Sequence, residues 1–441
     1  MIAKLVLDRK REGEVLGRAE IREFIEGFTR GAIPDYQMSA LAMAICCRGM
    51  NDRETADLTE AMMKSGACLE WSGVTADKHS TGGVGDKLSL VVQPLAAACG
   101  LSVPSLTGRG LGITGGTADK LETIPGYSCS LSLSRFREVV AETGVSMTVQ
   151  TDEIAPADRK LYALRDVTGT VASIPLIVAS ILSKKLAEGA GTLVFDVKAG
   201  RGAFMKTVDE AKILASALVN GARAAGRRAA ALVTAMDAPL GRAVGNANEV
   251  REAIALLKGA AAQDSALKGE EELCVELAAL MVSLGLGKPL AEARGLCRAR
   301  LADGSAWIRF AAMVKAHGGD LEAFDRLQTE PVRKFCLRSP RPGFVIAVDA
   351  EKVARVALRL GAGREKAGDA IDPLAGVTLA AVAGDRVAAG APLATLEKSF
   401  DAEGLEQAAA ELELAFSIGS EPPSPSPLVI ARLDGTMPGR G

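Results

Sequence analysis

The sequence predicts three structural parts: a discontinuous all-α helical lobe, a larger α/β lobe with a mostly parallel sheet, and a small C-terminal α/β or barrel-like module. Residues 18–65 repeat apolar side chains at helical spacing. Short apolar runs then alternate with glycine clusters and longer helical stretches, and alternating runs with turn signals follow residue 342. A chain of 441 residues has room for two or three domains of roughly 100–200 residues each.

The helical lobe is predicted to combine residues 1–66 with residues 158–189. The motifs IREFIEGFT, YQMSALAMAICCRGM and TADLTEAMMKSG space apolar residues three and four apart, and Asn51 can cap the third helix. In the later piece, Ser173 is a candidate N-cap and Pro175 falls in the first turn. We expect this piece to pack back on the N-terminal helices, so that two lobes enclose a cleft.

The α/β lobe is predicted over residues 67–157 and 190–335. Apolar runs such as LSLVVQPL, TLVFDVK and AALVTAM alternate there with helical stretches, a pattern typical of a parallel sheet with crossover helices. Residues 336–441 form the C-terminal module. The GDRVAAGAPL hairpin of this module is similar to those of biotinyl and lipoyl modules, but no lysine occupies the expected turn. The tail of the module is rich in Pro and Ser and is expected to be partly flexible.

The composition narrows the class of protein. A net charge of −2 with 48% hydrophobic residues excludes a mainly disordered chain and a nucleic-acid binder that works by bulk charge. Eight cysteines without CxxC spacing argue against a disulfide framework or a zinc ribbon, and favour a reducing cytoplasm. Two histidines exclude a metal site with three, so no metal ligand set is predicted.

The sequence gives no sign of a membrane partner. The N-terminus builds no apolar h-region and is not typical of a secretory signal. Residues 88–106 and 167–183 lack charge, but prolines interrupt both stretches, so we predict buried core there.

The densest chemical signal is the segment DKHSTGGVGDK at residues 77–87. Glycines let backbone amides approach an oxyanion, and Lys78 adds a full positive charge, so the segment is suited to hold a phosphate. It contains His79 and does not match a Walker A motif. The alternative is a glycine-rich surface turn.

A second glycine-rich run, TGRGLGITGGTADKLE, covers residues 107–122. Gly110, Gly112 and Gly115 spell GxGxxG, the pattern of a dinucleotide site. That fingerprint requires an acidic residue about twenty positions later, after a second strand, whereas Asp119 follows here almost at once. Two glycine loops so close together favour a small bound anion.

Arg165, Ser180 and Lys184 form a third group. Ser180 and Lys184 are four residues apart, so they share a helix face. A hydroxyl and two cations can recognise a carbonyl and an imide edge. The pattern fits a structural alternative equally well. In that alternative, Lys184 and Lys185 only complement the helix dipole, and Arg165 pairs with Asp166.

These segments, in order, resemble the thymidine and pyrimidine-nucleoside phosphorylase family. The segments that carry the resemblance are KHSTGGVGDK, SLTGRGLGITGGTADKLETIPGY, APADRKLYALRDVTGTVASIPLIVASILSKKLAEG, FDVKAGRGAFM and PLGRAVGNANEVREA. The resemblance covers about residues 1–415. It implies a cytoplasmic homodimer, dimerised through the helical lobe, that cleaves a pyrimidine nucleoside with phosphate to give a free base and a pentose 1-phosphate, in nucleoside salvage and without an organic cofactor.

The resemblance also implies roles for single residues. Base contacts would come from Arg165, Ser180 and Lys184, with His79, Arg165 and Lys184 as the catalytic groups. The implied phosphate contacts are Lys78, Ser80, Ser89, Thr107 and Thr117. The chemistry is consistent with these roles, because the departing base needs cations and a proton donor, and an imidazole with its ordinary pKa of about 6.5 suits the second task.

Several positions depart from the family pattern. Ile113 stands in place of a histidine, Ser105 in place of Met or Lys, Ala172 in place of Asp or Asn, Gly169 in place of Ala, and Arg201 in place of a small residue. We expect these changes to alter the pocket, and we hypothesise that it accepts a modified or unusual nucleoside.

A further departure concerns a monovalent cation. Some members of the family bind potassium with residues matching Gly85, Lys87, Leu240, Ala243 and Glu252, but have Thr at the position of Lys87. We hypothesise that the Lys87 ammonium replaces the ion and pairs with Glu252, since a fixed and a bound cation would repel each other. The alternative is a lysine that faces solvent.

Two rival functions are also consistent with the sequence. Anthranilate phosphoribosyltransferases are similar in fold and glycine loops, but the sequence shows no acidic cluster for magnesium pyrophosphate. A binding protein that has lost catalysis is the other, motivated by Ile113 and Arg201. His317 matches no functional position and is expected at a helix C-terminus before Gly318, where the dipole favours a cation.

Overall fold

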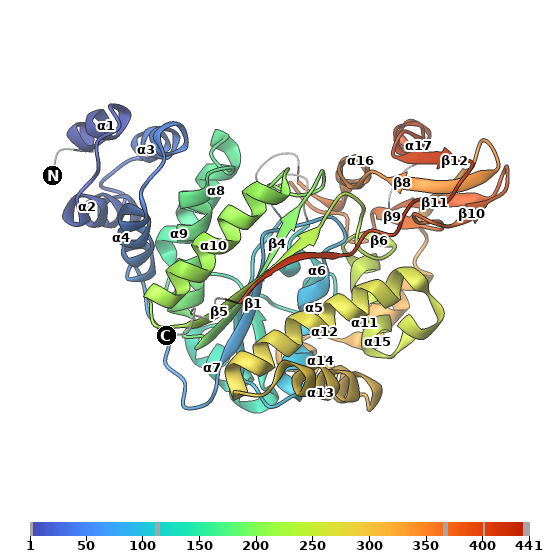
Figure 1. The fold of residues 1–441 in the computed structure, drawn as a ribbon, viewed down its shortest axis with the longest axis horizontal. Helices are drawn as coiled ribbons and strands as arrows, with labels where there is room; N and C mark the ends of the chain where they lie inside the picture. Colours follow the sequence, from blue (N-terminus) through green and yellow to red (C-terminus); the bar gives the residue numbers. More distant parts are fainter. Residues whose placement is uncertain (1–2, 111–114, 365–368, 400–401, 435–441) are drawn as a thin grey trace, which may run out of the picture.

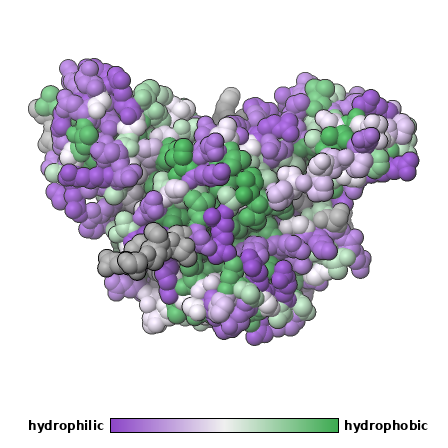
Figure 2. Space-filling view, viewed as in Figure 1, coloured by the Kyte–Doolittle hydropathy of each residue, from purple (hydrophilic) through white to green (hydrophobic). Residues whose placement is uncertain are grey.

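The computed structural model describes residues 3–110, 115–364, 369–399 and 402–434. The N-terminal helices lie at one end, the α/β lobe in the middle and the C-terminal module at the opposite end (Figure 1). On the face shown in Figure 2, the two end regions are mainly hydrophilic and apolar residues gather over the α/β lobe. In the described part of the chain, no helix combines the length and the apolar composition needed to cross a bilayer.

The predicted discontinuous helical lobe is present. Its helices are α1 (Ala3–Arg11), α2 (Arg18–Thr29), α3 (Asp35–Arg48), α4 (Asp52–Met63), α8 (Pro156–Thr168) and α9 (Ile174–Ala187). Asn51 caps α4 as predicted, accepting from the Glu54 amide at 2.8 Å. Ser173 occupies the N-cap position of α9, although its side chain makes no cap bond. Phe24 and Phe28 of α2 share one apolar core with residues of α8 and α9, so the later helices do pack back on the earlier ones.

The main sheet is largely parallel, as predicted. It contains the parallel strands β1 (Ala76–Ser80), β4 (Thr192–Ala199) and β5 (Arg228–Ala235), and a separate two-stranded sheet beside it consists of β2 (Val103–Leu106) and β3 (Val145–Thr148). β4 lies between β1 and β5, and β2 pairs with β3, all in parallel. A parallel bridge from Thr75 to Ser102 joins β2 to the β1 side. The carboxyl ends of these strands therefore point to one edge, where α/β sheets bind ligands.

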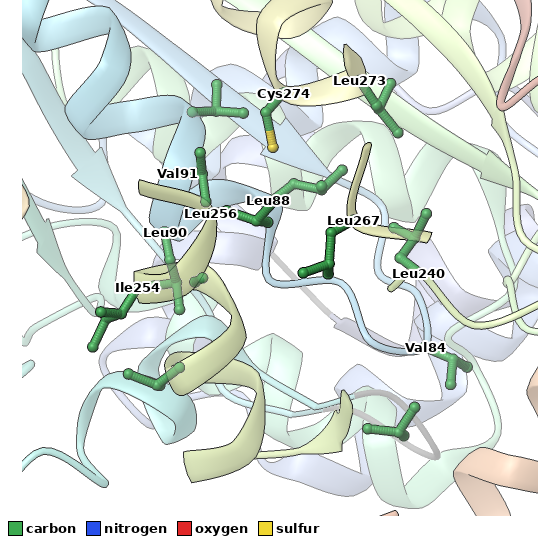
Figure 3. Packing of buried hydrophobic residues seen from close by; sticks show 14 of the residues in the cluster. Val84, Leu88, Leu90, Val91, Leu240, Ile254, Leu256, Leu267, Leu273 and Cys274 are labelled. Atoms are coloured by element: carbon green, nitrogen blue, oxygen red, sulfur yellow. The ribbon is translucent and has the colours of Figure 1, made fainter. Parts of the chain in front are cut away.

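Helices cover this sheet and enclose the main apolar core. They are α5 (Leu88–Ala98), α6 (Thr117–Leu121), α7 (Leu133–Thr143), α10 (Val208–Ala224), α11 (Ala247–Leu257), α12 (Ser265–Leu286), α13 (Leu290–Ala302), α14 (Ser305–Ala316) and α15 (Leu321–Arg326). Nearly every residue of α5 is buried, which explains why residues 88–98 carry no charge. Leu88, Leu240 and Leu267 belong to the same buried cluster (Figure 3), so the segment after β1 is part of this core.

The C-terminal module is built from two antiparallel sheets. Its elements are β7 (Arg333–Arg338), β8 (Gly343–Val348), α16 (Ala350–Ala357), β9 (Gly376–Leu379), β10 (Arg386–Val387), β11 (Pro392–Lys398), α17 (Leu405–Glu413) and β12 (Phe416–Gly419). One sheet has the order β10-β8-β12 and the other β6-β9-β11-β7. Because β6 (Ala243–Gly245) comes from the α/β lobe, its pairing with β9 ties the module to that lobe.

The end of the chain differs from the expected flexible tail. Residues Val429–Leu433 form β13, which pairs antiparallel with β5 and so joins the main sheet rather than the module (Figure 1). β5 would otherwise present an unpaired edge, and the run LVIARL contains the β-branched residues that suit a strand. Composition masked this short strand behind the Pro/Ser-rich residues before it.

Candidate active site

A pocket lies between the helical lobe and the carboxyl end of the main sheet. Its walls come from β1 and the loop after it, from the glycine loop after β2, and from α8, α9 and α10. The pocket lining includes the following predicted site residues: Lys78, His79, Ser80, Ser89, Thr107, Thr117, Arg165 and Ser180. Lys184 is the predicted residue that does not reach the wall.

Lys78 and Ser80 lie at the end of β1. Lys78 is fully buried, with its Nζ 3.3 Å from Asp196 on the neighbouring strand and 3.4 Å from the Ser89 hydroxyl. The Ser80 hydroxyl donates to Asp86 at 2.5 Å and accepts from the Gly82 amide at 3.1 Å. The first glycine loop is therefore folded inward on its own polar groups and is not an exposed turn.

Asp86 is a pocket residue that the sequence analysis missed. Burial alone would raise the pKa of its carboxyl, but Lys198, Lys78, Ser80 and Lys120 together hold it below the usual range. The group is thus an anion inside a pocket suited to another anion. Asp86 is part of the motif GVGDK, but a negatively charged residue does not suggest a phosphate site. Only the fold shows that lysines surround it.

The second glycine loop begins and ends at residues that line the pocket. Thr107 follows β2 and its amide donates to Thr148 at 2.7 Å, while Thr117 is the first residue of α6. The Ala118 amide donates to the Gly108 carbonyl at 3.1 Å and so brings the ends of the loop together. Gly112 and Ile113 lie outside the described residues. Asp119 lies in α6 rather than at a strand end, which is not the dinucleotide arrangement.

Arg165 occupies the helical wall and is 3% exposed. Its guanidinium donates to the carbonyls of Thr170, Val171 and Leu176 at 3.1, 2.7 and 3.1 Å. Burial lowers the pKa of this group from its ordinary value. Three of its five N–H groups are used, so two can still donate to a ligand.

Lys184 lies directly behind Ser180. Its Nζ is 3.0 Å from the Ser180 hydroxyl and 2.6 Å from Asp158. Burial, Lys185 and Arg165 lower its pKa, against the opposing effect of Asp158. Ser180 and Lys184 share a helix face as predicted, but in this conformation only Ser180 faces the pocket.

Lys185 lines the pocket and was not predicted to. It forms an ion pair with Asp77 and donates to the Leu106 carbonyl at 2.7 Å and to Glu188 at 3.1 Å. Burial and the neighbouring Asp77 carboxylate raise the pKa of Glu188 well above its ordinary value, against the opposing effect of Lys185. Because Asp77 and Lys185 are far apart in sequence, their pairing left no local signal.

His79 is half-buried on β1, opposite Phe195 of β4. Burial lowers its pKa well below 6.5, and the ammonium groups of Lys185, Lys184 and Lys78 lower it further. The expectation of an ordinary imidazole pKa is therefore wrong for the ligand-free pocket. The ring is neutral at pH 7 and offers one N–H donor rather than an imidazolium proton.

Most of the family departures lie away from the pocket. The expectation that Arg201 adds a cation to the pocket is wrong, because this residue is exposed. Its guanidinium lies 3.1 Å from the carboxylate of Asp349 in the C-terminal module and 3.4 Å from that of Asp237. Ala172 and Gly169 are exposed. Ser105 does line the pocket, accepting from Gln93 at 2.9 Å and donating to Asp77 at 3.2 Å.

Lys87 is fully buried in a cage of four oxygens. Its Nζ lies 2.9 Å from the Gly85 carbonyl, 3.0 Å from the Leu240 carbonyl, 2.6 Å from Glu252 and 3.2 Å from Glu270. Burial opposes the charge, but these carboxylates and Glu249 raise the lysine pKa. The expected pair with Glu252 is present, and the alternative of a lysine facing solvent is wrong.

His317 ends α14 and lies outside the pocket. Its Nδ1 donates to the Ser128 carbonyl at 2.8 Å, so Nε2 accepts from the Ser146 hydroxyl at 2.8 Å. Burial lowers its pKa to about 4. The helix-end position was predicted correctly, but the ring is neutral, so the dipole argument for a cation there is wrong.

Three family models match successive parts of the chain. Residues 4–66 match the model described as "Glycosyl transferase family, helical bundle domain". Residues 72–307 match "Glycosyl transferase family, a/b domain", and residues 344–419 match "Pyrimidine nucleoside phosphorylase C-terminal domain".

Curated relatives match over most of the chain. A pyrimidine-nucleoside phosphorylase of Geobacillus stearothermophilus is 46% identical over 397 residues, which cover 89% of this chain and 90% of that one. A thymidine phosphorylase of Mesorhizobium japonicum is 44% identical and covers 98% of this chain and 99% of its own. Among solved structures, anthranilate phosphoribosyltransferase from Thermus thermophilus matches with a TM-score of 0.57 at 21% identity, over 72% of this chain and 99% of its own, which shows a likeness of fold alone. The chain belongs to the family of pyrimidine-nucleoside and thymidine phosphorylases.

Proposed function

We propose that the chain catalyses the reversible phosphorolysis of a pyrimidine nucleoside to a free base and a pentose 1-phosphate. The observation that carries this proposal is a single pocket with two chemically different walls. Lys78, Ser80 and the glycine loops supply donors for an anion on one wall. Arg165 and Ser180 supply donors for a heterocycle on the other.

The reaction breaks the bond between C1′ and the base nitrogen, and its electron pair goes to the base. An oxygen of phosphate forms the new bond to C1′, so no covalent enzyme intermediate is needed. Holding phosphate against Lys78, Ser80, Ser89, Thr107 and Thr117 would place it for attack and remove part of the entropic barrier. The free N–H groups of Arg165 stabilise the negative charge that develops on the base, an effect that can reach about 3 kcal/mol for one well-placed donor.

His79 is influenced by both walls, because Lys78 on one side and Lys184 and Lys185 on the other depress its pKa. As a neutral ring it donates a hydrogen bond to a base carbonyl as charge builds there. A phosphate dianion bound beside Lys78 offsets the nearby ammonium charges and raises the His79 pKa toward the range of a proton donor. Phosphate binding thus prepares the imidazole for the leaving base.

Release of base from a nucleoside mixture, measured with and without phosphate, tests this proposal. Wild type is expected to release base only with phosphate, and His79→Ala is expected to lose at least a hundredfold in kcat/KM, within the usual range for a lost proton-transfer group. His317→Gln is the matched control, since it removes the other histidine and leaves the pocket unchanged. Base release that needs no phosphate would contradict the proposal.

The same assay separates the two rival functions. A phosphoribosyltransferase would require pyrophosphate chemistry, and the solved relative of that class supports a shared fold only. A binding protein without activity would bind the nucleoside and release no base.

We also propose that the pocket prefers a modified or unusual nucleoside over plain thymidine or uridine. It is supported by Ser105, the departure from the family pattern that lines the pocket in the described structure, where it leaves a small hydroxyl beside Gln93 and Asp77. Values of kcat/KM over a nucleoside panel test it, and a clear preference for plain thymidine or uridine would refute it.

We propose that the Lys87 ammonium takes the place of a monovalent cation. The carbonyls of Gly85 and Leu240 and the Glu252 carboxylate already contact Nζ, so a potassium ion does not fit beside it. Wild-type activity should be unchanged when tetramethylammonium replaces potassium. Lys87→Thr should become dependent on potassium, whereas the exposed control Lys258→Thr should not. A wild type that needs potassium would refute this.

We propose a cytoplasmic homodimer that acts in nucleoside salvage and uses no organic cofactor. The eight free cysteines are consistent with a reducing compartment. Tyr36 and Met43 of α3 are 74% and 43% exposed and stand seven residues apart, so they share an outer helix face that a second copy can cover. Light scattering of wild type and Tyr36→Lys tests the dimer, and a wild-type monomer would contradict it.

A further inference from the structure

Within the residues that the structure describes, a side chain of the C-terminal module reaches the second glycine loop of the pocket. Arg364, which follows α16 in the chain, donates from Nη2 to Asp119 Oδ1 of α6 at 3.0 Å. This contact joins residues 245 positions apart. None of the described residues of the module lines the pocket. The contact therefore connects this module to a loop whose two ends, Thr107 and Thr117, do line it.

Asp119 organises the base of that loop. Its Oδ2 accepts from the Gly110 amide at 2.6 Å, and its Oδ1 lies 3.2 Å from Arg109. The side chain is 3% exposed, so its charge depends on the cations beside it. Gly116 closes the loop so tightly that a Cβ there would lie 2.1 Å from the Gly110 nitrogen. The Gly110 bond to Asp119 therefore sets where the loop leaves the pocket.

Arg109 alone is a poor partner for Asp119. Its guanidinium forms a two-point pair with Glu122, at 2.6 and 3.1 Å. That geometry directs its charge to Glu122. Arg364 supplies the second cation, and it donates to the same Asp119 oxygen that lies near Arg109.

The backbone next to Arg364 is fixed to the α/β lobe. Asn246 is fully buried at the start of α11 and donates to the Ala362 carbonyl at 2.7 Å. Within the module, the Asp372 amide donates to the Gly361 carbonyl at 2.9 Å. The loop also lies against this junction, because a Cβ on Gly115 would lie 3.5 Å from the Gly245 carbonyl of β6. Arg364 therefore reaches Asp119 from an anchored base.

We propose that Arg364 is a positioning residue for phosphate. Resting on the proposed function, this inference assigns to the C-terminal module the task of fixing, through Asp119, the described ends of the second glycine loop, where Thr107 and Thr117 line the pocket. Without Arg364, the nearly buried carboxylate shares one already engaged cation, and its negative charge acts on a phosphate in the same pocket. The loop then loosens at Gly110.

Steady-state kinetics of Arg364→Gln test this inference. The KM for phosphate is expected to rise about 3- to 10-fold, the size of effect that one partly exposed charged hydrogen bond supports. The KM for the nucleoside and kcat should change less than about 2-fold, because the nucleoside base binds to the helical wall and not to this end of the loop. Arg359→Gln is the matched control, since Arg359 pairs with Glu411 inside the module.

Two further variants separate positioning from general damage. Arg364→Lys keeps the charge and should recover part of the phosphate KM. In an Asp119→Asn background, Arg364→Gln should add no further loss, because the amide still accepts from Gly110 but no longer needs a cation. Additive losses would overturn the pairing.

Calorimetric binding of inorganic phosphate distinguishes this inference from the proposed function. If wild type binds phosphate and Arg364→Gln binds it equally well, the inference fails while the proposed function stands. If wild type binds no phosphate and releases no base, the proposed function fails. Weaker phosphate binding by Arg364→Gln with an unchanged control supports both.

Discussion

Acid sensitivity of His317 can be predicted from its surroundings. The ring is 3% exposed, stacks on Tyr127 with centroids 4.5 Å apart, and hydrogen-bonds through both nitrogens as a neutral ring. Its pKa is about 4 in the folded chain against 6.5 as the ordinary value. The unfolded chain therefore takes up a proton first as the pH falls.

This difference in pKa sets the direction and the size of the change in the free energy of unfolding with pH. His317 contributes its full stability above pH 6.5, and this contribution is lost between 6.5 and about 4. The loss amounts to about 3 kcal/mol in the free energy of unfolding. In His317→Gln the amide can donate to Ser128 and accept from Ser146 without titrating.

Urea unfolding of both proteins from pH 7 to 4 measures the effect. The stability of wild type relative to His317→Gln should fall by about 3 kcal/mol over this range, since the other groups cancel in the comparison. Imidazole proton resonances give a direct check, because the chain has only two histidines. A His317 resonance that titrates near pH 6.5, or a constant stability difference, would refute the reasoning.

Three other changes have definite expected outcomes. Gly241→Ala should destabilise the fold severely, because the φ of Gly241 is +63° and a Cβ there would lie 2.1 Å from Glu252 Oε1. Gly226 has a φ of +77° but open space around it, so Gly226→Ala should lower the free energy of unfolding by only about 1 kcal/mol, as measured by chemical denaturation. Lys185→Met should raise the pKa of His79, seen as an upward shift of its imidazole titration; an unchanged titration would show that Lys185 does not act on the ring. Truncation after residue 427 should lower the melting temperature and promote aggregation by exposing the edge of β5, and an unchanged melting temperature would contradict this role of β13.

The sequence was most informative where chemistry and position coincide. Lys78, His79 and Ser80 are consecutive, so one motif placed them together at a strand end, and the spacing of Ser180 and Lys184 fixed their common helix face. Periodicity and capping predicted the helical lobe because α2 and α4 each carry a continuous apolar stripe.

Other features depend on distant residues and had no local signal. Lys185 pairs with Asp77 from another part of the chain, and the low pKa of His79 arises from three lysines that only the fold brings near it. Arg201 stands beside a conspicuous glycine motif, yet its partners Asp349 and Asp237 direct it away from the pocket. Charge alone could not show in which direction these side chains point.

The place of β13 has a consequence for how the protein is made. Every other strand of the main sheet has left the ribosome long before residues 429–433 are synthesised, yet β5 receives its outer neighbour only from them. During translation the lobe that carries the pocket must therefore remain one strand short. Nascent chains stalled before this point should attract chaperones that recognise unfinished sheets.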